Sequence, residues 1–117
     1  MFCLFCLLPK IESIYLYLND LTGTIPPEFG NLRLSEFQAH LNSISGTIPN
    51  ELYSNTDLKL LRLDFNQLEG TISDNLGNLR SLFDVRLEEN FLEGTLPASF
   101  TSLVDLSKCA QVGRICK

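Results

Sequence analysis

Apolar and polar positions follow one order along most of the chain, and that order is repeated. Its clearest copy lies at residues 58–79, LKLLRLDFNQLEGTISDNLGNL. The defining positions are Leu58, Leu61, Leu63, Asn66, Leu68, Gly70 and Ile72. The other copies start at Ile11, Leu34 and Leu82, so the step between copies is 23, 24 and 24 residues. A fixed period in this range is typical of a solenoid, because one unit cannot bury its apolar face alone and stacked units share a core.

Within each copy the pattern predicts a short strand followed by a turn. Apolar residues alternate around Leu16, with Ile14, Leu16 and Leu21 predicted to point inward. An asparagine lies in the turn that follows each predicted strand, at Asn19, Asn42, Asn66 and Asn90. A side-chain amide has two donors and one acceptor, so this asparagine ladder is predicted to satisfy backbone groups that the bend leaves unpaired. A glycine four residues later, at Gly23, Gly46, Gly70 and Gly94, predicts a positive φ or a space too tight for a side chain.

These residues carry a family resemblance. The segments NDLTGTIPPEFGNL, NSISGTIPNEL, NQLEGTISDNLGNL and NFLEGTLPASFTSL resemble the plant-type extracellular leucine-rich repeat, LxxLxLxxNxLxGxIPxxLGxLxx. The resemblance implies a right-handed leucine-rich repeat solenoid of the α/β class, rich in β structure. Its short parallel strands would line the concave face, and irregular or 3-10 turns would form the outer side. It also implies an extracellular or cell-surface location and no catalytic activity.

The repeat frame divides the chain into three parts. Residues 1–10 are either the tail of a truncated earlier repeat or a signal-peptide remnant. Residues 11–103 hold four repeats, at about 11–33, 34–57, 58–81 and 82–105. Residues 104–117 are a degenerate fifth repeat or a C-terminal cap. Cys109 and Cys116 could form a disulfide there, which the extracellular resemblance favours, or they could be two free thiols.

The second repeat departs from the pattern on its outer side. Asn55 occupies a position that is leucine in the other three repeats, and Tyr53 stands where two other repeats have glycine. We therefore expect a looser or bulged outer turn at residues 54–57.

Composition and charge exclude several classes of function. The net charge of -5 argues against nucleic-acid binding, which requires a basic surface. No run of 18 apolar residues occurs, so the chain would belong to a membrane protein only through a segment not included here. His40 is the only histidine, and no nucleophile motif stands beside it. We expect no catalytic residues, no metal site and no cofactor.

The outward strand positions are the predicted binding site. Alternation and stacking align them in columns. One column is Tyr15, Gln38, Arg62 and Arg86, and the next is Tyr17, His40, Asp64 and Glu88. A flanking column is Leu18, Leu41, Phe65 and Glu89. Tyrosine and arginine are common anchors of binding hot spots. In the alternative interpretation, the arginines and carboxylates of these columns only pair with one another across adjacent strands.

We predict a non-catalytic, monomeric module that binds a protein or peptide, as part of a receptor-like or secreted recognition protein. Four strands offer roughly 250 Å², against about 800 Å² per partner in a standard interface, so a short peptide fits best. One alternative is a surface-active protein of ice or cell walls, since Thr24, Thr47, Thr71 and Thr95 recur once per repeat. Another is a gene fragment with no independent function.

Overall fold

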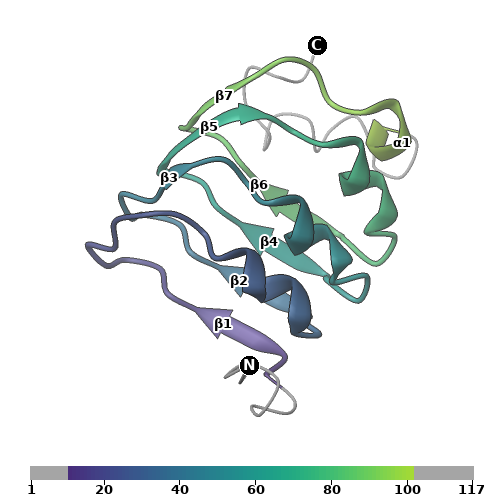
Figure 1. Cartoon of the computed structure of the whole chain (residues 1–117), viewed down its shortest axis with the longest axis horizontal. Coiled ribbons are helices and arrows are strands. Elements are labelled where there is room, and N and C mark those ends of the chain that lie inside the picture. Colours follow the sequence, from purple (N-terminus) through teal and green to yellow (C-terminus); the bar gives the residue numbers. More distant parts are fainter. Residues whose placement is uncertain (1–10, 102–117) are drawn as a thin grey trace.

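The computed structural model describes residues 11–101, in which successive coils of the chain stack along one axis (Figure 1). Strands β1 (Ser13–Tyr15), β2 (Glu36–Gln38), β4 (Leu60–Arg62) and β6 (Asp84–Arg86) form one parallel sheet in that order. Strands β3 (Ser45–Gly46), β5 (Gln67–Thr71) and β7 (Phe91–Glu93) form a second parallel set. Each coil therefore contributes one strand to the first sheet, whose outward surface we call the concave face.

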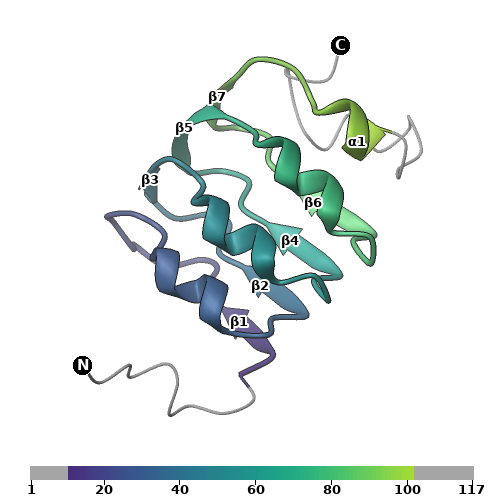
Figure 2. The ribbon, with the colours of Figure 1, turned by 45° about the vertical axis from the view of Figure 1, so that its right-hand side comes forward.

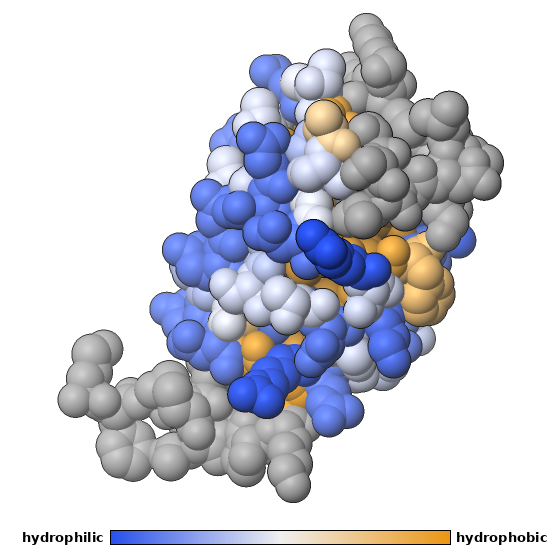
Figure 3. All heavy atoms as spheres, turned by 90° about the vertical axis from the view of Figure 1, so that its right-hand side faces the viewer, coloured by the Kyte–Doolittle hydropathy of each residue, from blue (hydrophilic) through white to orange (hydrophobic). Residues whose placement is uncertain are grey.

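The opposite side of each coil is a short helical turn. These turns are the 3-10 segments η2 (Pro27–Asn31), η3 (Asn50–Ser54) and η4 (Asp74–Asn78), followed by the short helix α1 (Ala98–Thr101). Figure 2 shows them in one row, each beside the next. Hydrophilic residues cover much of this outer side, and apolar residues show in patches between them (Figure 3). The predicted solenoid, with parallel strands and 3-10 outer turns, is confirmed.

The core consists of the inward leucines and their equivalents from each repeat. Leu61, Leu63 and Leu68 have no exposed surface, and the equivalent residues of repeats two and four are also buried. In the first repeat Ile14 and Leu16 are half-buried, whereas Leu21 is exposed. Burial of apolar surface is the main stabilising contribution of such a core, at about 25 cal/mol per Å².

The asparagine ladder bonds each coil to the one before it. Asn66 donates from Nδ2 to the carbonyl of Leu63 in its own coil, at 3.1 Å, and to that of Ala39 in the preceding coil, at 2.9 Å. Its Oδ1 accepts from the backbone N–H of Ile44 at 3.0 Å. Asn42 and Asn90 repeat the same bonds one coil earlier and one coil later. Asn19, in the first repeat, donates only to carbonyls of its own coil, those of Leu16 and Tyr17.

The glycine and threonine columns have a joint structural role. The four glycines of the column have φ between 77° and 85°. A Cβ on Gly46 would lie 2.8 Å from Cγ2 of Thr24, and one on Gly70 would lie 3.0 Å from Cγ2 of Thr47. The methyls of Thr24, Thr47 and Thr71 thus pack over the glycine of the next repeat, which gives threonine at these positions a reason within the fold.

The outer turn of the second repeat is regular, so the expected loosening at residues 54–57 is wrong. Segment η3 has the same length as η2 and η4. Asn55 is 2% exposed; its Nδ2 donates to the carbonyls of Leu52 and Phe29, and its Oδ1 accepts from the N–H of Leu34. The asparagine in place of leucine therefore bridges two coils on the outer side, as the ladder does near the strands.

Several sequence predictions concern residues beyond this range. The alternatives for residues 1–10, and the cap with its disulfide between Cys109 and Cys116, lie outside the described residues.

Candidate binding surface

The parallel register of the first sheet aligns the first predicted column. Tyr15 pairs with Gln38, Gln38 with Arg62, and Arg62 with Arg86. Tyr15 is exposed and its hydroxyl donates to the carboxylate of Glu36. This hydrogen bond raises the pKa of Tyr15 above its ordinary value. The four side chains of this column therefore stand next to one another on the concave face, as predicted.

The second column, Tyr17, His40, Asp64 and Glu88, follows directly after the strands; we call it the polar column. The ring of Tyr17 stacks on that of His40 with centroids 4.8 Å apart and planes inclined by 9°. Although both lie on the concave side, His40 is only 6% exposed and Asp64 only 2%. Tyr17 remains exposed and Glu88 is half-buried. The polar column is therefore recessed in its middle and open at its N-terminal end.

The ion pairs of this face differ from the cross-strand pairs of the alternative interpretation. Arg62 pairs with Asp64 at 3.3 Å, and Arg86 pairs with Asp84 at 3.3 Å. In both cases the partners belong to one coil and lie two residues apart in the sequence. Glu88 forms neither of these pairs.

Four buried polar atoms of this face have no hydrogen-bond partner within the protein: His40 Nδ1, Arg62 Nε, Asp64 Oδ1 and Glu88 Oε2. Burial disfavours the charged form of a side chain, so it raises the pKa of Glu88 and lowers the pKa of His40. Buried polar groups are normally hydrogen-bonded, and at these four atoms the protein itself supplies no partner.

The flanking column, which the sequence placed beside the two predicted columns, supplies an apolar surface. Leu18, Leu41, Phe65 and Glu89 all have φ between 56° and 59°, a region that bulky residues rarely occupy. Leu18, Leu41 and Phe65, which we call the apolar column, are 68%, 39% and 48% exposed. They line an open groove of about 560 Å³ together with Asn19, Asp20, Asn42 and Ser43. The sequence signal was three apolar residues directly preceding the ladder asparagines.

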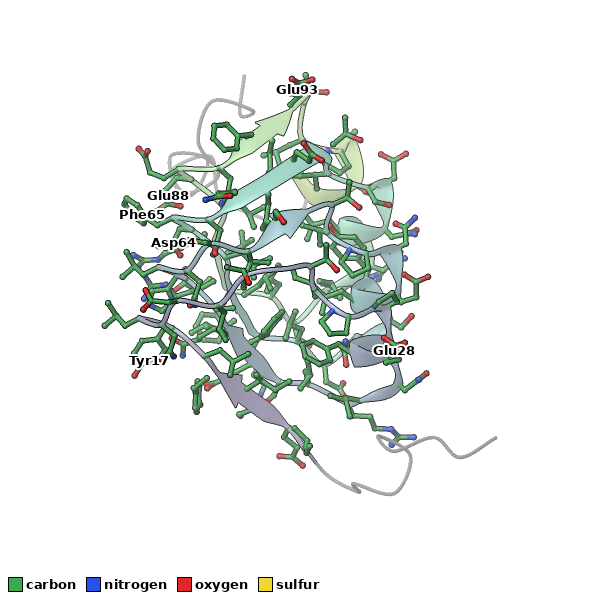
Figure 4. All side chains as sticks on the ribbon, turned by 60° about the vertical axis from the view of Figure 1, so that its left-hand side comes forward. Tyr17, Glu28, Asp64, Phe65, Glu88 and Glu93 are labelled. Carbon is green, nitrogen blue, oxygen red and sulfur yellow. The ribbon has the colours of Figure 1, made fainter. Side chains whose placement is uncertain are left out.

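Figure 4 shows how these columns lie relative to the outer turns. Tyr17, Asp64, Phe65 and Glu88 gather at one edge of the solenoid, whereas Glu28 of η2 lies on the opposite side. Among residues 11–101, no group of histidine, cysteine, aspartate or glutamate is arranged to hold a metal ion. No helix in this part of the chain is long and apolar enough to cross a membrane.

Comparison with known proteins supports the repeat assignment. A family model described as Leucine Rich Repeat matches residues 10–32 and 57–79. No curated protein sequence matches the chain. Among solved structures, a chain of the BIR3–SERK2 complex from Arabidopsis thaliana has 32% identity and a TM-score of 0.77, with 82% of this chain and 52% of that chain covered.

Two further solved structures are receptors in complexes. The plant peptide hormone receptor RGFR1, in complex with RGF2, is 43% identical with a TM-score of 0.79 over 81% of this chain and 15% of that chain. The ectodomain of the receptor kinase GASSHO1/SCHENGEN3 from Arabidopsis thaliana, in complex with CASPARIAN STRIP INTEGRITY FACTOR 2, is 36% identical with a TM-score of 0.76. It is matched over 79% of this chain and 11% of its own length. This chain thus spans about half of the first relative and a smaller part of the other two.

The repeat pattern, the asparagine ladder, the parallel sheet with 3-10 outer turns and the similarity to receptor ectodomains agree with one another. The chain belongs to the plant-type leucine-rich repeat proteins.

Proposed function

We propose that the chain is a non-catalytic recognition module that binds a peptide or protein through its concave face. The observation that carries the proposal is the chemistry of the aligned outward positions. The core, asparagine and glycine positions recur in each repeat, whereas the first column reads Tyr15, Gln38, Arg62 and Arg86. Such variation is typical of a surface that reads a partner, and tyrosine and arginine are its usual anchors.

The relatives support a peptide as the partner and the cell exterior as the location. RGFR1, a plant peptide hormone receptor, was solved in complex with RGF2. By analogy, this chain would act as a monomer outside the cell, as part of a receptor-like or secreted recognition protein. A strand residue advances about 3.3 Å and neighbouring strands lie about 4.8 Å apart, so the outward surface of four short strands is narrow. An extended peptide fits such a surface better than a globular protein does.

Peptide selection tests this proposal. The full chain would be used to select binders from a displayed random peptide library, and the affinities of the selected peptides would be measured by fluorescence polarisation. We expect Tyr15→Ala combined with Arg86→Ala to weaken binding by more than about tenfold, since two hot-spot contacts are removed.

The matched control places two substitutions on the outer turns, Glu28→Ala with Glu51→Ala, both at exposed positions. Its affinity should equal that of the unchanged chain, and far-UV circular dichroism should show the same fold for both variants. A failure to select any peptide, or a loss of binding in the outer-turn variant alone, would overturn the proposal.

A further inference from the structure

We infer that the polar and apolar columns together form a subsite for a basic side chain next to a large apolar one, within an extended peptide. This inference rests on the proposed function, because it names the class of peptide that the concave face would select. It is carried by three observations: the contact between the columns, the groove along the apolar column, and the unpaired acceptors of Asp64 and Glu88 in the polar column.

The two columns are joined by backbone hydrogen bonds. The N–H of Leu41 donates to the carbonyl of Asp64 at 3.1 Å, and the N–H of Phe65 donates to that of Glu88 at 3.0 Å. Each member of the apolar column is thus attached to the polar-column residue of the next repeat. Figure 4 shows Asp64, Phe65 and Glu88 together at the same edge of the solenoid.

The groove along the apolar column has room for a side chain. Its volume is about 560 Å³, and it is shallow and open to solvent. Leu18, Leu41 and Phe65 supply apolar surface, and the backbone conformation with positive φ holds these side chains outward. An apolar side chain of a peptide would lose water-exposed surface against these three residues.

The charge beside this groove selects the neighbouring residue of the peptide. Asp64 Oδ1 and Glu88 Oε2 are buried acceptors without a donor, and Arg62 is already engaged with the other oxygen of Asp64. Asp20 lines the groove as well, and Glu89 continues the apolar column with a second exposed carboxylate. A lysine or arginine side chain supplies the missing donors and compensates the negative charge, and hydrogen bonds between charged groups are the strong ones.

His40 is a second and independent sign of an incomplete site. His40 is only 6% exposed, and its Nδ1 has no hydrogen-bond partner within the protein. Its ring is held by stacking on Tyr17, so it lies in the polar column in a defined orientation. A backbone amide of the bound peptide would satisfy this nitrogen, which would place the peptide along the polar column.

Two capped hexapeptides test the inference. They share the sequence acetyl-Gly-Ser-Leu-X-Ser-Gly-amide, in which X is arginine in one and glutamate in the other. Binding to the ¹⁵N-labelled full chain would be followed by amide shifts in heteronuclear NMR spectra. We expect the arginine peptide to shift the amides of residues 41, 65 and 88, and to bind at least about tenfold more tightly than the glutamate peptide.

Two variants and one control make the test specific. Glu88→Gln should weaken the arginine peptide by about tenfold while preserving side-chain shape. Phe65→Asn should weaken it as well, because it removes the apolar surface with a residue that tolerates a positive φ. Glu28→Gln removes an exposed carboxylate of η2 on the opposite side and should leave the affinity unchanged.

Equal affinities for the two hexapeptides, or shifts confined to the outer turns, would overturn the inference. The same holds if Glu88→Gln and Glu28→Gln have the same effect. Failure here is distinguishable from failure of the proposed function: library peptides that depend on Tyr15 and Arg86 but lack the basic–apolar pair would overturn only the subsite.

Discussion

Replacing Asn66 by alanine removes a side chain that connects two coils. Four hydrogen bonds are lost: three donated by Nδ2, to the carbonyls of Ala39, Leu63 and, at a longer 3.4 Å, Asp64, and one accepted by Oδ1 from the N–H of Ile44. The carbonyl of Ala39 keeps a bond from Asn42, and that of Leu63 keeps one from Asn90. The N–H of Ile44, whose residue is buried, loses the acceptor that this side chain provides.

These losses set the expected magnitude. Each of the two shorter bonds to carbonyls contributes about 0.5–1 kcal/mol, the longer one to Asp64 adds little, and leaving a buried N–H without an acceptor costs about 1–3 kcal/mol. We expect Asn66→Ala to lower the free energy of unfolding by about 2–5 kcal/mol. The measurement is urea unfolding followed by far-UV circular dichroism, with linear extrapolation to water.

Asn19 provides the matched control, because it is the same residue at the same repeat position. It is exposed and donates to the carbonyls of Leu16 and Tyr17, where water can replace it. We expect Asn19→Ala to cost less than about 1 kcal/mol. If Asn66→Ala costs no more than Asn19→Ala, the bonds between coils do not stabilise the solenoid and the reasoning is refuted.

Three further predictions concern other features of the coils. Gly30→Ala should lower the melting temperature more than Gly23→Ala. A Cβ at residue 30 would lie 2.4 Å from the carbonyl oxygen of Glu51, an overlap that costs about 1–3 kcal/mol, whereas a Cβ at residue 23 meets no neighbour and only the positive φ is strained. Equal losses in melting temperature would contradict this prediction. Glu89→Asn should raise the free energy of urea unfolding by about 0.5–1 kcal/mol, because asparagine tolerates the φ of 56° better than glutamate; a loss would contradict the prediction. The lowered pKa of His40 means that the unfolded chain binds a proton more readily, so its contribution to stability is present above the unfolded pKa of about 6.5 and is lost as the pH falls through the folded pKa. His40→Gln should therefore show a smaller drop in melting temperature between pH 7.5 and pH 5.5 than the unchanged chain, and an equal drop would contradict the assignment.

The fold could be predicted because its determinants are local and repeated. The asparagine of the ladder needs a fixed distance from its own strand, and Asn66 lies three residues after Leu63, to whose carbonyl it donates. The same spacing recurs in every repeat, so one pattern specified the strand, the turn and the register together. The error concerned Asn55, which was interpreted as a disruption because leucine is the usual residue there. Its bonds to Leu52 and Leu34 follow the logic of the ladder on the opposite side of the coil.

The sequence predicted on which side of a strand each site residue lies, but not how deeply its side chain is buried. Alternation correctly placed Gln38 and Arg62 beside each other on the outward side of the sheet. It could not show that Asp64 is covered, because its burial depends on the pairing with Arg62 and on the neighbouring coils. The conformation of Phe65 was equally inaccessible from the pattern, since a positive φ is unusual for such a residue. Depth and backbone strain come from tertiary packing, whereas periodicity reports only the side of the strand.

Folding and recognition are carried by different positions of the same coil. Asn66 must be an asparagine because it bonds both to its own coil and to the preceding one, and a change there affects both. Asp64 is only two residues earlier, yet the equivalent residues of the other repeats are tyrosine, histidine and glutamate. Apart from the stacking of Tyr17 on His40, those side chains make none of the contacts described above between successive coils, so the residue type can differ from repeat to repeat. The unpaired polar atoms of His40, Asp64 and Glu88 therefore lie at positions where the fold does not fix the residue type.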